Sequence, residues 1–256
     1  MSKWNTFTRR QEILSMLKTE NSLSVAALSA FFDVSEVTIR SDLQVLAQLG
    51  KLIRTHGGAV PAEYAETARD FTQTIKENSE VKTDLARQAA AMVKDGDTVI
   101  IDSGSTMAIL ARMLHGKNIT VLTNSLPVMQ ELSRDEGIEL LIIGGSFRRS
   151  VQASVGEFSA EVLRSINADI LFMGCTSFDV QKGITCPNLN ERITKRLMID
   201  ASCTVCVVAD HTKSNSTSLI NVAQWNEIDC FVTDCINDED NALLQSKGVK
   251  VLLPLC

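Results

Sequence analysis

The sequence has few aromatic residues, no excess of basic residues and no long apolar run. Its 256 residues include nine Phe, two Trp and one Tyr, although 45% of them are hydrophobic. Aliphatic side chains must therefore supply most of the core, and this length suits one large domain or two smaller ones. No apolar stretch approaches the length of a membrane-spanning helix, and the N-terminus lacks the apolar segment of a secretory signal. We expect a cytoplasmic protein with no membrane partner.

Basic residues are outnumbered by acidic ones, 25 against 31, which gives a net charge of −6. Over the whole chain this total argues against a polyanionic partner such as nucleic acid. The charge is unevenly divided, however. Residues 1–60 hold seven basic and five acidic side chains, a net of +2, whereas residues 61–256 hold 18 and 26, a net of −8. We therefore expect two parts with different partners.

Cysteine is scattered, and its number, seven, is odd. This usage is typical of a reducing compartment. Cys203 and Cys206 have CxxC spacing, but they lie in the apolar run 203–210, where a strand would point residues three apart to opposite faces. We therefore expect no shared metal ion or redox pair at this position.

Other motifs of metal and nucleotide sites are also missing. Neither GxxxxGK nor GxGxxG occurs, so nucleotide binding gains no support. His56, His115 and His211 are isolated from one another in the sequence. We expect no metal ion and no cofactor.

Residues 8–49 contain three short segments with helical periodicity. The apolar residues that share a face are Ile13, Leu14 and Leu17; Val25, Leu28 and Phe32; and Ile39, Leu43 and Leu46. Ser24 and Ser35 stand where N-caps belong, and Gly50 follows the third segment as a stop. The basic, β-capable segment 51–59 comes next, as a small hairpin or wing would. Three small helices with a tight turn between the last two match a helix-turn-helix, whose later helix enters the DNA major groove.

The outer face of the third helix carries side chains suited to that groove. If its apolar residues face inward, the opposite side presents Val37, Thr38, Arg40, Ser41 and Gln44. Arg can bind guanine and Gln adenine through two hydrogen bonds, and Val or Thr can contact the thymine methyl group. Phosphates would be contacted by Arg9, Arg10, Lys51, Arg54 and the free amides at the helix N-terminus, where Ser35 lies. The pattern alone also fits a three-helix subdomain with a solvated polar face, and Glu36 beside the reading face counts against DNA.

From residue 97 onward, strand-like and helix-like segments alternate. The expected strands are 98–102, 118–124, 138–145, 168–174, 203–210, 229–235 and 249–255. Apolar strands separated by helices indicate a parallel sheet covered on both faces. We predict an α/β protein with a helix-turn-helix domain in residues 1–60, a linker in 61–80, and a doubly wound, mostly parallel sheet domain in 81–256.

Small polar residues follow three successive strands of this predicted sheet. They are Ser103, Gly104, Ser105 and Thr106; Thr123, Asn124 and Ser125; and Gly144, Gly145 and Ser146. Ligands of doubly wound sheets bind at the carboxyl ends of strands, and small residues let backbone N–H groups approach an anion near a helix N-terminus. One such turn would be ordinary helix capping, but three in register favour a compact phosphate-bearing ligand.

Three charged residues are further candidates for this ligand site. Asp102 ends a buried strand and needs a donor or a ligand hydroxyl group there. Glu191 and Lys195 are four residues apart on one expected helix, and this spacing by itself indicates a solvent-exposed ion pair.

Two groups of motifs resemble one known family. The segment from Arg9 to Val60, with VSEVTIRSDL and RTHGGA, resembles the winged helix-turn-helix of the DeoR family of bacterial transcriptional regulators. DSGST, TNS, IIGGSFR, GITCPNLNE and ADHTK resemble its effector domain, whose fold is similar to ribose-5-phosphate isomerases and glucosamine-6-phosphate deaminases. The family usually has two adjacent basic residues where this chain has Arg40 and Ser41. At 175–179 the family more often has a Gly-rich, Asp-containing sequence, and Ser214 stands where it usually has Phe.

The resemblance implies roles for individual residues. It makes the helix that begins near Ser35 the recognition helix. In the effector domain, Ser103 to Thr106 would cradle a phosphate with help from Lys195, and the sugar hydroxyls would face Asp102, Asn190 and Glu191.

Two functions from different classes remain open. The favoured one is a transcriptional regulator, a homo-oligomeric repressor of a carbohydrate operon that binds double-stranded operator DNA under the control of a phosphorylated sugar. The alternative is a sugar-phosphate isomerase or deaminase-like enzyme with an appended small domain, in which Asp102 or Glu191 would serve as general base. The N-terminal module counts against the alternative, because an isomerase does not need one.

Overall fold

The computed structural model describes residues 4–20, 23–49, 51–55, 57–61 and 71–254. The chain divides into an N-terminal unit, Met1–Asp70, and a sheet unit, Phe71–Cys256, and each is described by itself. Within the described residues, no helix has both the length and the apolar character needed to span a membrane. Gly50, His56 and part of the predicted linker 61–80 lie outside the described residues.

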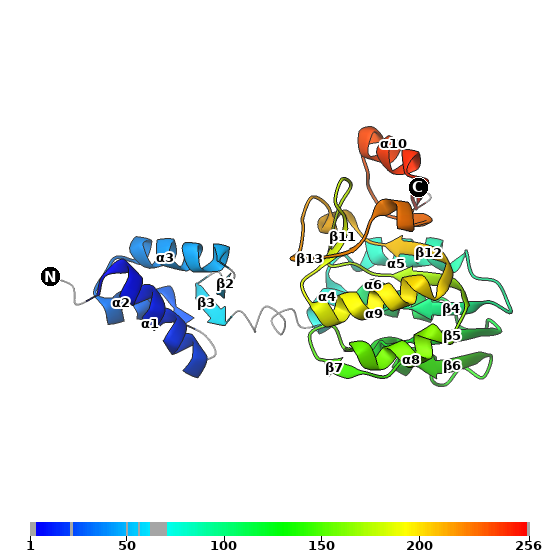
Figure 1. Ribbon diagram of the computed structural model, residues 1–256, viewed down its shortest axis with the longest axis horizontal. Coiled ribbons are helices and arrows are strands. Elements are labelled where there is room, and N and C mark those ends of the chain that lie inside the picture. Colours follow the sequence, from blue (N-terminus) through cyan, green and yellow to red (C-terminus); the bar gives the residue numbers. More distant parts are fainter. Residues whose placement is uncertain (1–3, 21–22, 50, 56, 62–70, 255–256) are drawn as a thin grey trace. The chain divides into compact units, whose positions relative to one another are not determined.

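Three helices and a small antiparallel sheet form the N-terminal unit (Figure 1). The helices are α1 (Thr6–Thr19), α2 (Val25–Phe32) and α3 (Glu36–Gln48), and the strands are β1 (Leu23–Ser24), β2 (Leu52–Thr55) and β3 (Gly58–Pro61). The strand order is β1-β3-β2, so β2 and β3 form the expected hairpin after α3. This is a winged helix-turn-helix, as predicted.

The predicted caps and apolar faces account for this arrangement. The Ser24 hydroxyl accepts a hydrogen bond from the Ala27 amide at 3.1 Å, and that of Ser35 accepts one from the Thr38 amide at 3.2 Å. Asp33 ends α2 in the left-handed region, with φ of 50°. All nine predicted apolar residues are buried except Leu14, which is half-buried, and they form one core with Leu52 of the wing.

A seven-stranded parallel sheet forms the centre of the sheet unit. Its strands are β4 (Thr98–Ile101), β5 (Ile119–Thr123), β6 (Ile138–Ile142), β9 (Ala168–Met173), β12 (Ser202–Val208), β14 (Cys230–Val232) and β15 (Lys250–Leu252). The order is β15-β14-β12-β9-β4-β5-β6, and every neighbouring pair is parallel. These are the seven strands that the sequence predicts, and the α/β fold class is confirmed.

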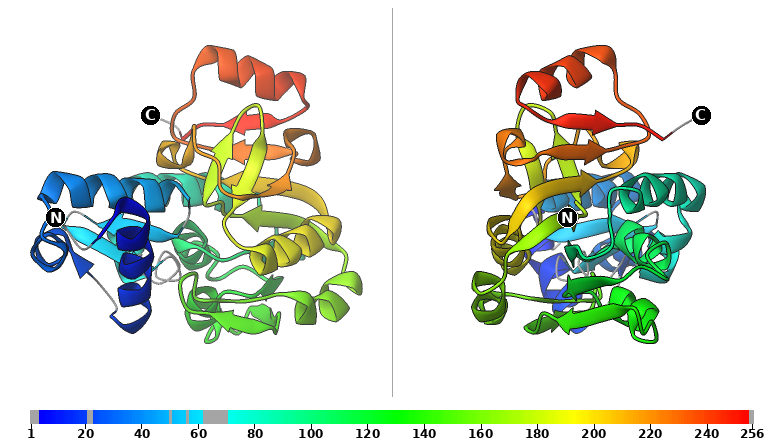
Figure 2. Two further views of the ribbon diagram at one scale, coloured as in Figure 1. Left: turned by 60° about the vertical axis from the view of Figure 1, so that its left-hand side comes forward. Right: turned by 90° about the vertical axis from the view of Figure 1, so that its right-hand side faces the viewer.

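Helices cover both faces of this sheet. One face packs against α5 (Ser79–Ala90), α6 (Ser105–Arg112) and α7 (Leu126–Leu132), and the other against α8 (Ala160–Arg164), α9 (Leu189–Asp200) and α10 (Asp238–Ser246). The alternation along β4 shows why both faces are apolar, since Val99 and Ile101 belong to the first core and Ile100 to the second. Figure 2 shows α10 in red near the β15 edge, with the green β6 at the opposite edge.

Several short elements were not anticipated from the sequence. They are the hairpin β7 (Ser146–Arg148) and β8 (Ala153–Val155), the antiparallel sheet of β10 (Ser177–Asp179), β11 (Gly183–Cys186) and β13 (Ile220–Ala223), and the 3₁₀ turns η2 (Glu157–Ser159), η3 (His211–Lys213) and η4 (Trp225–Glu227). Elements of three or four residues are too short for a hydrophobic period to be recognised in the sequence. A short helix, α4 (Phe71–Lys76), precedes α5.

Candidate functional site

The outer face of α3 is exposed over the predicted reading residues. Val37 is 72% exposed, Arg40, Ser41 and Gln44 are also exposed, and Thr38 is half-buried. An exposed Val at the second position of a helix makes no contribution to the core, so its apolar surface is available to a partner. The sequence placed these side chains on one face, and the structure brings them together there.

Two charged contacts order this face. The guanidinium of Arg40 donates to the carboxylate of Glu36 one turn earlier, with Nη2 and Oε2 separated by 2.7 Å. In β2 of the wing, Arg54 donates from Nη1 to the Gln44 side-chain oxygen. Glu36 therefore neutralises part of the Arg40 charge, and the wing is tied to the third turn of α3.

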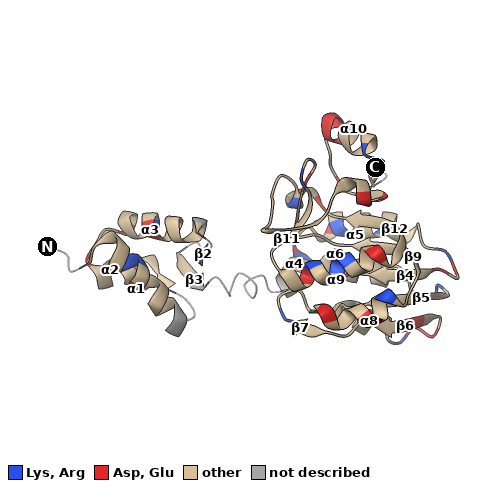
Figure 3. Ribbon diagram, in the orientation of Figure 1, with Lys and Arg blue, Asp and Glu red and all other residues tan. Residues whose placement is uncertain are grey.

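Arg9 and Arg10 of α1 have a structural contact that the sequence analysis missed. Their Nε atoms donate to the two oxygens of Asp42, at 2.6 Å and 2.7 Å. Asp42 is 2% exposed and Arg9 is 6% exposed, so the ion pair between α1 and α3 is buried. Figure 3 shows the basic segment of α1 in blue and acidic positions of α3 in red. The available signal was the position of Asp42 three residues after Ile39, on the inner face of the helix.

The predicted effector loops lie where strands of the central sheet end. This side of the sheet, formed by the carboxyl ends of the strands, is called the carboxyl edge below. Asp102 follows β4, Asn124 and Ser125 follow β5, and Gly145 comes shortly after β6. Because β4, β5 and β6 are adjacent and parallel, their carboxyl ends meet at the same edge. Gly174, at the end of neighbouring β9, belongs to this edge too.

Lys195 and Asp102 form a buried ion pair at this edge. Lys195 is on α9, and its Nζ also donates to the Gly174 carbonyl oxygen at 2.7 Å. Burial lowers the pKa of Lys195, but the charge and hydrogen bond of Asp102 outweigh that effect, so the pKa is raised and the ammonium stays charged. The interpretation of Lys195 and Glu191 as an exposed pair is wrong, because both are buried and each has another partner.

Glu191 forms its ion pair with the β7–β8 hairpin and not with Lys195. Its carboxylate lies 2.9 Å from Nε of Arg148, and both side chains are largely buried. Asn188 caps α9 by accepting hydrogen bonds from the amides of Asn190 and Glu191. Asn190 is exposed beside Gly156. The first turn of α9 is therefore fixed next to the hairpin.

The loop before α6 leaves the amides at the start of that helix without a side-chain cap. Gly104 is the N-cap at φ of +128°, a conformation that favours glycine, and it has no side chain to accept a hydrogen bond. Ser105 and Thr106 are each 8% exposed, and Ser103 is half-buried with its hydroxyl 3.5 Å from Asp102. This geometry suits an anion at the helix N-terminus.

The loop after β5 contains two buried oxygen atoms without hydrogen-bond partners among the described residues, Asn124 Oδ1 and Ser125 Oγ. Asn124 uses its amide nitrogen to donate to the Ser154 carbonyl at 2.8 Å, while the Thr123 hydroxyl donates to the Ile101 carbonyl at 2.6 Å. Thr123 thus bridges β5 to β4, whereas the other two retain unused capacity, which is costly in a buried position.

Gly145 contributes space to this edge. Its φ is +154°, and a Cβ at this position would come within 2.9 Å of the Val155 carbonyl oxygen. A side chain there would therefore push β8 away from the loop. The hairpin can approach only because residue 145 is glycine.

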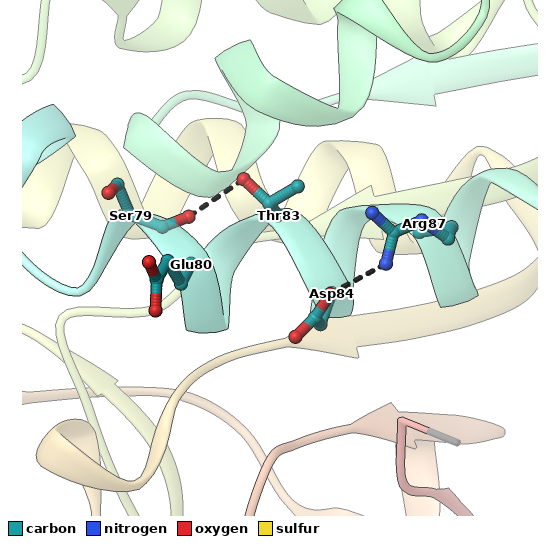
Figure 4. Close-up of a pocket in the computed structure, with 5 residues that line it drawn as sticks. All are labelled: Ser79, Glu80, Thr83, Asp84 and Arg87. Atoms are coloured by element: carbon teal, nitrogen blue, oxygen red, sulfur yellow. Dashed lines mark hydrogen bonds and ion pairs between the residues drawn. The ribbon is translucent and has the colours of Figure 1, made fainter. Parts of the chain in front are cut away.

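An open depression elsewhere in the sheet unit does not coincide with these loops. It is lined by Ser79, Glu80, Thr83, Asp84 and Arg87, all on α5 (Figure 4). Arg87 donates to Asp84 at 2.6 Å, and the Thr83 hydroxyl donates to the Ser79 carbonyl. Four of the five lining residues are joined in these two pairs along a single helix.

The cysteines behave as their positions predict. Cys203 is exposed and Cys206 is buried, on opposite faces of β12. Within the part of the chain that the structure describes, no cluster of three His, Cys, Asp or Glu side chains is arranged to hold a metal ion.

A winged helix-turn-helix followed by a parallel α/β unit is typical of one class of protein, the transcriptional regulators. Two family models match this chain. The DeoR-like helix-turn-helix domain matches residues 9–64, and the DeoR C-terminal sensor domain matches residues 77–235. The chain belongs to the DeoR family.

Known relatives agree with this assignment over almost the whole chain. The HTH-type transcriptional repressor GlcR of Bacillus subtilis is 34% identical over 94% of this chain and 93% of its own length. A putative aga operon transcriptional repressor of Escherichia coli O157:H7 is 32% identical over 97% and 94%. The protein is therefore a DNA-binding transcriptional regulator and not an enzyme, so the isomerase alternative falls.

Among solved structures, ribose 5-phosphate isomerase A of Methanocaldococcus jannaschii is similar to part of the chain. It is 18% identical, with a TM-score of 0.41, and the match covers 54% of this chain and 55% of the isomerase. This likeness is too distant to carry an argument.

Proposed function

We propose that this regulator is a repressor of a carbohydrate uptake or catabolism operon, and that a phosphorylated sugar controls its affinity for operator DNA. In this proposal residues 1–60 bind DNA, residues 61–80 link the two domains, and residues 81–256 bind the effector. The protein acts in the cytoplasm. The observation that supports a phosphate-bearing effector is the buried ammonium group of Lys195 at the carboxyl edge of the sheet. Two relatives, the repressor GlcR and the putative aga operon repressor, support repression as the direction of control.

The effector phosphate binds the loop before α6. The amides of Ser103 to Thr106 donate to it, with the positive end of the α6 dipole behind them. Lys195 supplies a full positive charge. The loops after β5 and β6 complete this subsite through Thr123, Asn124, Ser125 and Gly145.

The sugar hydroxyls bind the opposite side of the same edge. Asp102 and Glu191 accept hydrogen bonds from hydroxyl groups, and Asn190 both donates and accepts. The unpaired oxygens Asn124 Oδ1 and Ser125 Oγ belong to the phosphate subsite, where a hydroxyl group of the same ligand would satisfy them.

Operator DNA binds the exposed face of α3. Base edges meet Val37, Thr38, Arg40, Ser41 and Gln44, while phosphates meet the amides near Ser35 and the guanidinium groups of Arg10 and Arg54. Arg9, being buried against Asp42, acts at DNA mainly by holding α1 in place. A homo-oligomer, a dimer or tetramer, presents two such helices to two half-sites.

Whether the effector raises or lowers DNA affinity follows from the thermodynamic linkage between effector binding and DNA binding. An effector lowers DNA affinity only to the extent that it binds the DNA-free conformation more tightly than the DNA-bound one. No chemical step is needed, because binding alone shifts the equilibrium between the two conformations.

Arg40→Ala tests the DNA half of the proposal. We expect loss of specific operator binding, with the melting temperature and effector binding unchanged, because Arg40 is exposed and makes only a surface ion pair. Arg87→Ala, an exposed arginine of the sheet unit with a similar surface pair, is the matched control. Unchanged binding by the Arg40 variant would remove α3 from the reading role.

A thermal-shift screen with phosphorylated sugars tests the effector half. A ligand that binds the native state raises stability by RT ln(1 + [L]/Kd). The double variant Ser105→Glu and Thr106→Glu should lose the shift and the release of DNA by the effector, yet retain DNA binding. If that variant responds as the wild type does, the effector phosphate binds elsewhere.

A further inference from the structure

Arg54 and Gln44 join the wing to α3 through a side-chain hydrogen bond. Arg54 donates from Nη1 to Oε1 of Gln44, and both side chains are exposed. In a strand, residues two apart share a face. Leu52 of β2 is buried in the core with α3, so Arg54 lies on the same side of the wing and reaches the exposed part of the helix.

The chemistry of this pair fixes the orientation of the Gln44 amide. A guanidinium has only donors, so it can bind only the oxygen of the amide. The amide therefore turns Oε1 toward the wing, and its NH2 group is left to face a partner. The bond from Arg54 occupies one of the two lone pairs of Oε1. The two side chains together therefore present several N–H donors, from the amide and the guanidinium, and one remaining acceptor lone pair.

The two purines present different patterns in the major groove. Guanine offers two acceptors, N7 and O6, whereas adenine offers the acceptor N7 and the donor N6–H2. An isolated Gln binds adenine because its oxygen and nitrogen point to the base side by side. When the oxygen is engaged by Arg54, it is a poorer acceptor for adenine N6–H2, and the added guanidinium donors match the two acceptors of guanine.

We propose that Arg54 is a specificity-determining residue, which makes Gln44 select guanine over adenine at the base pair that it meets. The inference rests on the proposed reading role of α3. It assigns Arg54 a task beyond the phosphate contact expected from the sequence, and it replaces the adenine contact expected for Gln44 alone.

The test is selection of double-stranded DNA from a random pool by the full-length chain, followed by sequencing. The position that Gln44 meets is the one whose base preference disappears in Gln44→Leu. In Arg54→Met, which keeps the length of the side chain and removes its donors, the guanine-to-adenine ratio at that position should fall about tenfold or more. Lys51→Met is the matched control, because Lys51 is an exposed cation of the same segment for which no bond to Gln44 is found among the described residues.

The possible results distinguish a failure of the Arg54 inference from a failure of the proposed reading role of α3. The control should bind all sequences more weakly with the same preference. If Arg54→Met behaves as this control does, with guanine retained, Arg54 contacts phosphate alone and the inference is overturned. If the wild-type chain enriches no sequence, the proposed reading role of α3 fails, and the inference fails with it.

Discussion

Lys195 and Asp102 pair across the carboxyl edge of the sheet with side chains that are 7% and 1% exposed. Each charge depends on the other because neither has bulk water to solvate it. The pair joins α9 to the end of β4, and the second bond of Lys195 to Gly174 adds the end of β9. Three elements that are distant in the chain therefore meet at one ammonium group.

Lys195→Met should destabilise the sheet unit by about 3–5 kcal/mol, because it leaves a buried carboxylate unpaired. Urea denaturation followed by circular dichroism measures the change in the free energy of unfolding. Adding Asp102→Asn to this variant should restore part of the loss, since the uncompensated charge is gone.

Arg87→Met is the control for this prediction. It breaks an exposed pair with Asp84, so its cost should stay within about 1 kcal/mol. If Lys195→Met costs no more than this control, the pair is not a structural element.

Asp42→Asn should loosen the N-terminal unit selectively. The substitution removes the anion shared by Arg9 and Arg10 and leaves the Arg9 charge buried without a counter-ion, at a cost of about 3 kcal/mol. Amide hydrogen exchange on the full chain should show faster exchange in α1 and α3. The amides of the sheet unit serve as the internal control, and unchanged protection in α1 would contradict the prediction.

His115 should titrate above the ordinary value of about 6.5. Hydrogen bonds to Asp135 and then to Glu131 raise its pKa, with distances of 3.0 Å and 3.3 Å. Because the folded pKa is the higher one, the stabilisation is complete below the unfolded value and is lost as pH rises through the folded value. An NMR titration of the imidazole protons measures the pKa, and Asp135→Asn should lower it. A midpoint unaffected by Asp135→Asn would rule out this pairing.

Cysteine alkylation should distinguish the desolvated thiol of Cys175 from the exposed thiols. Cys175 is half-buried, and desolvation raises the pKa of its thiol to about 12, so the thiol stays protonated and reacts slowly at pH 8. Cys203 and Cys235 are exposed and should react first with iodoacetamide in the native protein. Mass spectrometry of peptides identifies the labelled sites, and denatured protein is the control in which every thiol reacts. Equal native rates for Cys175 and Cys203 would contradict the raised pKa of Cys175.

The helices and sheet strands could be predicted from the sequence because they depend on the local periodicity of hydrophobic residues and on helix capping. Ser24 and Ser35 are N-caps for reasons contained within four residues. The strands of the sheet are apolar on both faces, so their pattern stands out whatever packs against them. Small loops after successive strands could also be placed at one edge, since parallel strands share their direction.

The partners of charged side chains could not be predicted in this way. Asp42 is separated by more than 30 residues from its two arginines, and Lys195 by 93 from Asp102. The spacing of Glu191 and Lys195 indicated a surface pair, yet burial gave each a different partner. The same holds for Arg54, whose bond to Gln44 crosses from the wing to the helix.

The sequence by itself therefore determined the two kinds of unit, their helices and sheet strands, and the family to which the chain belongs. Only the tertiary structure decided which charges are buried and which groups they bind. The physical reason is that hydrophobic period and capping act over a few residues, whereas the free energy of a charge depends on everything that surrounds it in space.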